Sequence, residues 1–317
     1  MLHADIIDCP GCKVVSYYSA DHQAADRAIH EVLCVSIQHA NVEVDAHFNE
    51  LAAKCNECFV HKGEFHHLWE WRDIRSYIRA QRSLMDLLTQ VATQKSLRTA
   101  LDHALDILRL DMCDILDVKQ AIPAIMIRLG MDVEAYQFMR RHDGFNPDCR
   151  YAWAHLHMNI TQHRCQQWSN DTIILKKLGE QASLQFKVAT ALLQFRLLRC
   201  LRDLETANEL TSMLPLEIVH LVRDNLIYDL VVHDTVLWQE VCAGKSLHDR
   251  ILELEKQLQE MFRAVRTDSP AFWSALVGLQ EVADPQTKIA LKQSRDSWVE
   301  TVGASEWVHD QLRLTDL

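Results

Sequence analysis

Apolar residues recur three and four positions apart through most of the chain, which is the pattern of amphipathic helices. Between residues 97 and 110, for example, Leu101, Leu105 and Leu108 fall on one helical face. The segment 171–209 carries apolar residues on more than one side, which predicts a helix buried in the centre of its domain. We predict helices over residues 19–33, 42–60, 97–110, 118–129, 133–141, 171–209 and 247–266, with a long helix after a turn within 63–93 and another that opens at Pro215.

Residues that start and stop helices support these elements. Ser19, Ser96 and Asp171 stand where N-caps are expected, and Gly130 follows a helix as a C′ residue does. Only eight glycines and six prolines occur in 317 residues, which disfavours the frequent tight turns of β proteins. Short helices separated by short loops are typical of antiparallel neighbours in helical arrays. The sequence therefore predicts an all-α fold.

The candidate chemistry lies near the N-terminus, where cysteines and a histidine follow the spacing of a zinc site. Cys9 and Cys12 form a C-x2-C pair around Pro10-Gly11, a step that favours a tight turn because proline fixes φ and glycine tolerates positive φ. His30 and Cys34 form an H-x3-C pair, and positions i and i+4 share one face of a helix. Thiolate and imidazole are the usual ligands of structural zinc. We predict one zinc ion held by Cys9, Cys12, His30 and Cys34.

The residues around these ligands add a family resemblance. The series Cys9-x2-Cys12, Tyr17-Tyr18-Ser19, Gln23, Asp26 and His30-x3-Cys34 resembles the second half of a MYND-type zinc finger. That family binds two zinc ions through interleaved ligands, and the resemblance implies that the four residues above make one complete site. Tyr18 and His22 stand where the other site of the family has cysteines, so we expect one zinc ion and not two.

MYND fingers, as a family, are protein-interaction modules that can hold short peptides containing proline and leucine. Gln23 matches one residue of the peptide-facing surface, and Arg27 stands where the family has tryptophan. The stretches 68–80, 100–110 and 122–138 also look like a group of fungal MYND-finger proteins, whose body is a tetratricopeptide-like helical domain. The resemblance therefore implies half of a MYND-type finger packed on an α-helical array.

These patterns divide the chain into three parts. We predict a partial MYND-type zinc finger over residues 1–40, a tetratricopeptide-like helical domain over 41–282 and a polar tail over 283–317. The tail is either an edge helix or a partly disordered segment, and its tryptophans, Trp298 and Trp307, are placed to dock back on the body.

Two further groups of cysteine and histidine raise the question of additional metal. One is the pair Cys55 and Cys58 with the three histidines that follow it, for which the apolar spacing over 42–60 favours core positions on one helix. The other is the crowd of histidines and cysteines between His155 and Cys165, for which a connecting loop is the favoured interpretation. Metal binding at either group stays open as the second interpretation.

Composition and charge narrow the class of protein. The net charge of −11 argues against binding to nucleic acids or anionic membranes. There is no run of about 18 apolar residues that would predict a membrane span, and residues 1–20 lack an apolar secretory core. Ten cysteines without a secretory signal favour the reducing cytoplasm or nucleus. We interpret the arginine row of 72–82 as a solvated helix face, with a groove for acidic partners as the alternative.

A zinc site with four protein ligands has no open position for a substrate, which is typical of structural sites. We therefore expect a non-catalytic zinc-binding adaptor whose partner is another protein or a peptide. The alternative is an enzyme, either a relative of the protein-lysine methyltransferases, because some MYND fingers accompany SET domains, or a metal hydrolase that uses the cluster between Cys149 and Cys165. The few glycines and the absence of an Asn-His pair weigh against a SET domain.

Overall fold

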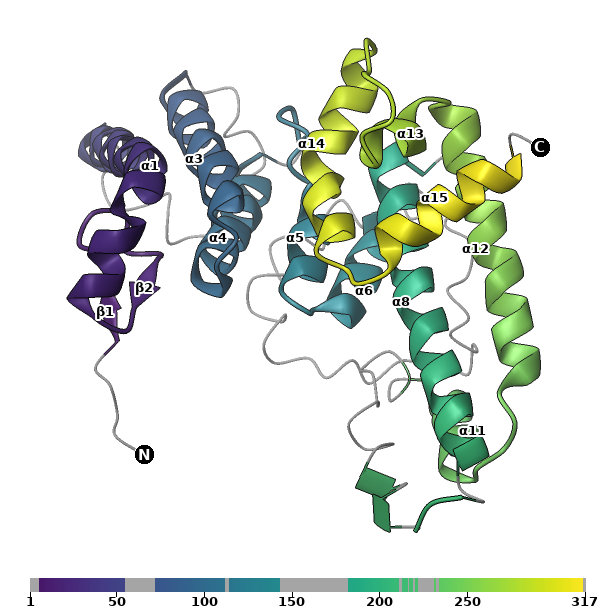
Figure 1. The fold of residues 1–317 in the computed structure, drawn as a ribbon. Coiled ribbons are helices and arrows are strands. Elements are labelled where there is room, and N and C mark those ends of the chain that lie inside the picture. The colour runs from purple at the N-terminus through teal and green to yellow at the C-terminus, as the bar shows by residue number, and fades with distance from the viewer. Residues whose placement is uncertain are drawn as a thin grey trace. The chain divides into compact units, whose positions relative to one another are not determined.

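A computed structural model describes residues 6–54, 72–111, 114–142, 182–210, 213–215, 217–218, 220–221, 231 and 234–315. Over these residues the protein is mainly helical with one two-stranded sheet, so the predicted all-α class is confirmed (Figure 1). The elements are β1 (Ile7–Asp8), β2 (Ser16–Tyr17), α1 (Ala20–Lys54), α3 (Arg72–Val91), α4 (Gln94–Leu110), α5 (Ile122–Arg128), α6 (Asp132–His142), α8 (Leu184–Glu209), α11 (Thr235–Cys242), α12 (His248–Asp268), α13 (Phe272–Leu276), α14 (Pro285–Val299) and α15 (Ala304–Thr315).

The described residues fall into two compact units, one up to Ile125 and the other from Met126 onward. The domain limits predicted at residues 40 and 282 stay predictions. Helix α1 runs unbroken through residue 40, and the segment predicted as a polar tail contains α14 and α15. Within the described part of the chain, no helix is both long enough and apolar enough to cross a membrane.

The first unit is built on three helices, in which α3 packs against both α1 and α4. Ile37 of α1, Ile78 of α3 and Leu101 of α4 are buried in its core. The N-terminal hairpin pairs β1 with β2 in antiparallel register, with Ile7 opposite Tyr17, and β2 contacts α1. The hairpin and the first half of α1 carry the predicted metal ligands.

Helix α1 is longer than the sequence pattern predicts. Ser19 caps it as expected, because the Ser19 hydroxyl accepts a hydrogen bond from the backbone N–H of His22 at 3.2 Å. The helix then continues to Lys54 and includes most of the next predicted helix. No glycine or proline interrupts it, and the buried Ile37 and Ala40 carry the core stripe across the expected gap.

Helix α4 begins three residues before its predicted start, and its cap is Thr93 instead of Ser96. The Thr93 hydroxyl accepts from the backbone N–H of Ser96 at 3.1 Å, and the Ser96 hydroxyl accepts from the backbone N–H of Thr93 at 3.1 Å. The two residues form a capping box. The cap prediction is wrong because either hydroxyl suits the position and the apolar pattern begins only at Leu97.

The helices predicted over 118–129 and 133–141 correspond to α5 and α6. Gly130 follows α5 with a φ of 73°, the left-handed conformation that closes many helices. Its N–H donates to the carbonyl of Ile127 at 3.0 Å, and the next N–H, of Met131, donates to the carbonyl of Met126 at 2.9 Å. The C′ role predicted for Gly130 is therefore confirmed.

The second unit is organised around α8, which packs against α6, α12 and α14. Buried side chains cover most of its circumference, including Leu192, Leu193 and Gln194 in succession, so its predicted central position is confirmed. The predicted start of this helix is wrong, since Ser183 caps it by accepting from the backbone N–H of Phe186 at 3.3 Å. The predicted cap, Asp171, lies outside the described residues.

Helices α14 and α15 pack on α13 through a cluster of aromatic rings. Trp298 of α14 is fully buried, with its ring centroid 5.0 Å from that of Trp273 in α13 and 6.4 Å from that of Trp307 in α15. The indole N–H of Trp273 donates to the carbonyl of Phe262 at 3.0 Å. Both tryptophans of the C-terminal segment therefore dock on the body of the second unit.

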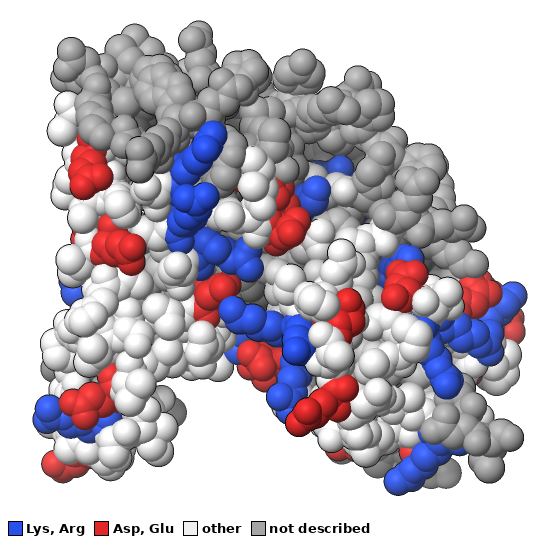
Figure 2. Space-filling model, turned by 90° about the horizontal axis from the view of Figure 1, so that it is seen from above, with Lys and Arg blue, Asp and Glu red and all other residues white. Residues whose placement is uncertain are grey.

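In the arginine row of α3, Arg82 makes hydrogen bonds within the first unit. Its guanidinium donates to the carboxylate of Asp86 at 3.1 Å and to the carbonyl of Leu116 at 2.7 Å. On the face shown in Figure 2, basic and acidic side chains are interspersed. These contacts agree with the interpretation of the row as a helix face balanced by acids.

Candidate metal centre

The loop between β1 and β2 positions the first two candidate ligands, Cys9 and Cys12. The Cys9 N–H donates to the carbonyl of Val15 at 2.8 Å, and the Lys13 N–H donates to the carbonyl of Cys9 at 2.9 Å. These bonds fold the loop into a tight turn in which Lys13 takes the left-handed conformation, with a φ of 61°. The positive φ expected at Gly11 is therefore found two residues later.

Gly11 lies where the hairpin approaches α1 closely. A Cβ atom at this position would lie 1.9 Å from Nε2 of Gln38 and 2.8 Å from Sγ of Cys34. Both distances are shorter than any stable contact, so a larger residue at position 11 forces these side chains to move. The absence of a side chain at Gly11 lets the hairpin lie against the helix that carries the other two ligands.

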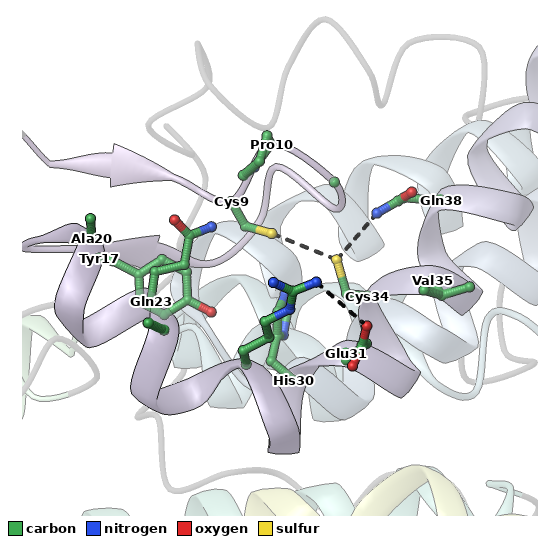
Figure 3. A pocket seen from close by; sticks show the side chains of 13 residues that line it. Cys9, Pro10, Tyr17, Ala20, Gln23, His30, Glu31, Cys34, Val35 and Gln38 are labelled. Carbon is green, nitrogen blue, oxygen red and sulfur yellow. Dashed lines mark hydrogen bonds and ion pairs between the residues drawn. The ribbon is translucent and has the colours of Figure 1, made fainter.

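The structure brings all four predicted ligands together. Cys9 and Cys34 have their Sγ atoms 3.6 Å apart, and Sγ of Cys12 lies 3.4 Å from Nε2 of His30. All four donor atoms lie within 4.8 Å of one another. The three thiols are buried and His30 is half-buried. Figure 3 shows Cys9 reaching from the hairpin toward Cys34 on the helix.

The separations of 3.6 Å and 3.4 Å are close to those expected around one tetrahedral metal ion. With Zn–S bonds of about 2.3 Å and Zn–N bonds of about 2.0 Å, two sulfur ligands lie about 3.8 Å apart and a sulfur and a nitrogen about 3.5 Å apart. A disulfide would instead need an S–S distance of about 2.0 Å, and the three cysteines are free thiols. The cluster can therefore hold a metal ion.

The electrostatics of the thiols favour a cation among them. Burial raises the pKa of Cys9, but hydrogen bonds from the backbone N–H groups of Cys12 and Gly11 and from His30 and Cys34 outweigh it and lower that pKa to about 6. Burial and the charges of Cys9 and Cys34 raise the pKa of Cys12 to about 11. Neighbouring thiolates oppose one another's ionisation, and a divalent cation between them would remove that repulsion.

Three residues outside the ligand set support it. The side-chain amide of Gln38 donates to Sγ of Cys34 at 3.4 Å. The Tyr17 hydroxyl donates to the carboxylate of Asp26 at 2.7 Å, and the Tyr17 ring lies edge-on to the His30 ring with centroids 6.4 Å apart. Burial and the bond to Asp26 raise the pKa of Tyr17, so its hydroxyl stays protonated. Such contacts orient ligands and tune their basicity.

Sequence reasoning does not identify Gln38 as part of the site. Its signal is its spacing, because it stands four residues after Cys34 and one turn along the same helix face. This spacing places Gln38 beside Cys34 only if the helix continues past residue 33. By contrast, Tyr17 and Asp26 belong to the series that carries the family resemblance, and the structure places them in contact with each other.

A groove of about 450 Å³ opens beside the thiols (Figure 3). Its walls include Tyr17 of β2 and Gln23, Arg27, Glu31 and Val35 of α1. Arg27 and Glu31 form an ion pair across one helical turn, with Nη2 and Oε1 3.9 Å apart. The two positions at which the resemblance predicts a peptide-facing surface, Gln23 and Arg27, therefore line the same groove.

The other residues that could suggest a second metal site are not part of this cluster. Tyr18 and His22 are exposed, and among the described residues no second group of three or more potential ligands converges. The pair Cys55 and Cys58 and the region 149–165 lie outside the described residues, so the interpretations of both stay predictions.

Comparisons with known proteins add no assignment. No protein-family model matches the chain, and neither a curated protein nor a solved structure matches it significantly.

Proposed function

We propose that Cys9, Cys12, His30 and Cys34 bind one zinc ion and that the N-terminal region is a MYND-type finger reduced to a single site. The observation that carries this proposal is the convergence of their four donor atoms within 4.8 Å of one another. Three sulfur donors with one imidazole suit Zn²⁺ better than the hard cations, which prefer oxygen. Zinc would supply the charge that lets the neighbouring thiols ionise together.

The proposed zinc has a structural role. Four protein donors fill a tetrahedral coordination shell and leave no position for water or substrate. Two of the donors come from the hairpin and two from α1, so the ion would join these two elements. Metal binding at such a site contributes directly to folding free energy.

The function that we propose is a non-catalytic adaptor, which presents the groove beside the zinc site to a peptide segment of another protein. The groove combines an aromatic ring at Tyr17, an amide at Gln23 and a charge pair at Arg27 and Glu31. This mixture of apolar and hydrogen-bonding groups is suited to a short extended peptide. The resemblance to MYND-type fingers supports the same class of ligand.

Site-specific photo-crosslinking tests this proposal. A photoreactive amino acid replaces Gln23 at the groove or, as a control, Arg313, which is exposed on α15 in the other unit. We expect a specific protein to be captured from position 23 and not from position 313. Capture should be lost when Cys34→Ser removes a zinc ligand.

Two results would count against an adaptor that uses this groove. One is the absence of any protein captured specifically at position 23. The other is capture that is identical at positions 23 and 313, which would indicate nonspecific contact with the surface of the chain. Capture that persists in Cys34→Ser would show that partner binding does not depend on the proposed zinc site.

A further inference from the structure

Helix α1 carries exposed apolar residues on the face opposite its buried stripe. The exposed positions are spaced alternately four and three residues apart, and they are Ala28, Val32, Val35, His39, Val42 and Ala46. We call these six residues the α1 seam. Val32 and Val42 are 78% and 68% exposed, although the solvent face of a packed helix is normally polar.

The spacing of the α1 seam is the hydrophobic repeat of a coiled coil. Alternating steps of four and three residues give a mean period of about 3.5, which keeps one side of a helix against a partner helix. From Ala28 to Ala46 the seam extends about 27 Å at 1.5 Å per residue. Scattered apolar residues on a surface need no explanation, but a continuous seam with this period marks a surface for helix packing.

The charged residues beside the α1 seam are acidic. In a coiled coil the positions that flank the seam on either side face the flanking residues of the partner and set its identity. Here they are Glu31, Gln38 and Asp45 on one side and Ile29, Ser36 and Glu43 on the other. Three of the six are acidic and none is basic.

We propose that the α1 seam binds an amphipathic helix of a partner protein whose own apolar seam is flanked by lysine or arginine. This inference rests on the proposed adaptor function and names a second class of partner surface for it, which shares Glu31, Val35 and Gln38 with the peptide groove. The exposed His39 is the single polar residue of the seam. A polar residue inside such a seam fixes the register of the two helices at some cost in affinity.

A second copy of this chain fits the α1 seam less well. In a parallel pair of α1 helices, Asp45 of one copy would face Glu50 of the other. In an antiparallel pair that aligns the seam positions, Glu31 of one copy would face Asp45 of the other. Like charges at these flanking positions disfavour pairing of two copies. Lysine or arginine at the facing positions of a partner helix would instead attract the acidic residues of α1.

The probe for this proposal is a dye-labelled synthetic helix of about three heptads, with leucine at the seam positions and lysine at the flanking positions. The matched control peptide has glutamate in place of every flanking lysine. Fluorescence anisotropy is measured with the full chain loaded with zinc. We expect the lysine peptide to bind at least about tenfold more tightly than the glutamate peptide, and its affinity to fall as salt is raised.

Variants of the chain test whether the peptide binds at the α1 seam. Val32→Glu should weaken the lysine peptide by about tenfold or more, because it places a charge in the apolar seam. The double variant Glu31→Lys, Glu43→Lys should reverse the preference and favour the glutamate peptide. Val302→Glu, at a residue 70% exposed and outside α1, is the control that should change neither affinity. Circular dichroism verifies that each variant keeps its helices.

Three outcomes would overturn the proposal: equal binding of the two peptides, no binding of either, or a Val32→Glu variant that binds like the parent. A chain that dimerises in light scattering and becomes monomeric with Val32→Glu would assign the α1 seam to a second copy instead. Zinc content is measured on the same samples. A chain without zinc that still discriminates between the peptides would contradict the proposed metal site and leave the α1 seam supported.

Discussion

The hydroxyl of Thr93 donates a hydrogen bond to the backbone carbonyl of Val14 at 2.7 Å, across a sequence separation of 79 residues. Val14 belongs to the loop that carries Cys9 and Cys12, and Thr93 is the N-cap of α4. The same hydroxyl accepts the capping bond from the N–H of Ser96. One side chain therefore caps α4 and also anchors the hairpin that carries Cys9 and Cys12 to that helix.

Replacing Thr93 with valine keeps the shape of the side chain and removes both bonds. We expect Thr93→Val to lower the free energy of unfolding by about 1–3 kcal/mol, since it removes a cap and leaves a carbonyl without its donor. Urea denaturation measures the change. Thr93→Ser should stay near the parent. Thr99→Val is the matched control, because Thr99 is a half-buried threonine of the same helix whose hydroxyl donates to a carbonyl within that helix. Equal stabilities for Thr93→Val and Thr99→Val would contradict the double role.

Gly11→Ala tests the close approach of the hairpin to α1. The added methyl would press on Nε2 of Gln38 and Sγ of Cys34, at 1.9 and 2.8 Å in the present geometry. We expect metal affinity to fall about 10–100-fold, the range typical when residues behind a metal ligand are disturbed. Competition with a chromophoric chelator measures the affinity.

The companion variant Gln38→Ala separates the two contacts of that methyl group. On its own it removes the hydrogen bond to Cys34 and should weaken metal binding moderately. Combined with Gly11→Ala it removes the shorter clash and should restore part of the lost affinity. A Gly11→Ala chain that binds metal as tightly as the parent would show that the hairpin does not need this proximity.

Asp114 gives the first unit a pH dependence that does not involve the metal centre. Burial is the main cause that raises its pKa from 3.8 to about 6, while the N–H groups of Lys119 and Val118 oppose the shift by donating to its carboxylate. A carboxyl group whose pKa is higher in the folded chain binds more protons when folded. Its contribution to stability is therefore complete below pH 3.8 and is lost as pH rises through 6.

Asp114→Asn removes this titration and keeps an oxygen that can accept from Val118. We expect the variant to match the parent near pH 3 and to exceed its stability at pH 7 by about 1–3 kcal/mol. Denaturation of the two chains at a series of pH values measures the difference. A difference that is constant across the series would mean that Asp114 does not titrate as described.

Trp298 joins the last two helices to the second unit. It is fully buried between Trp273 and Trp307, so Trp298→Ala should cost about 3–5 kcal/mol through a large cavity. Hydrogen exchange should show faster exchange in α14 and α15 than in α4 of the other unit. Uniformly faster exchange in both units would contradict a local role for this ring.

The four candidate ligands can be predicted from the sequence because each pair is recognised from the spacing of nearby residues. Cys9 and Cys12 share one turn and His30 and Cys34 share one face of a helix, so two short spacings suffice to predict the cluster. The cap at Ser19 and the helix end at Gly130 are legible for the same reason. Each depends on backbone conformations that a few adjacent residues determine.

The predictions that were wrong concern features that depend on contacts between residues far apart in the sequence. The continuation of α1 past residue 33 accompanies its packing against α3. The residue that caps α4 is Thr93 and not Ser96, and the Thr93 hydroxyl also bonds to the distant carbonyl of Val14. Gly11 illustrates the same point, since its constraint comes from Gln38 on another element. Spacing along the chain carries no signal for contacts of this kind.

The zinc content of the purified chain tests the central claim most directly. Native mass spectrometry should find one zinc ion in the parent and none in Cys12→Ser, while Cys242→Ser, at an exposed cysteine of the other unit, should retain its ion. A parent chain without zinc, or a Cys12→Ser chain that keeps it, would contradict the proposed site and with it the reading of the N-terminal region as a zinc finger.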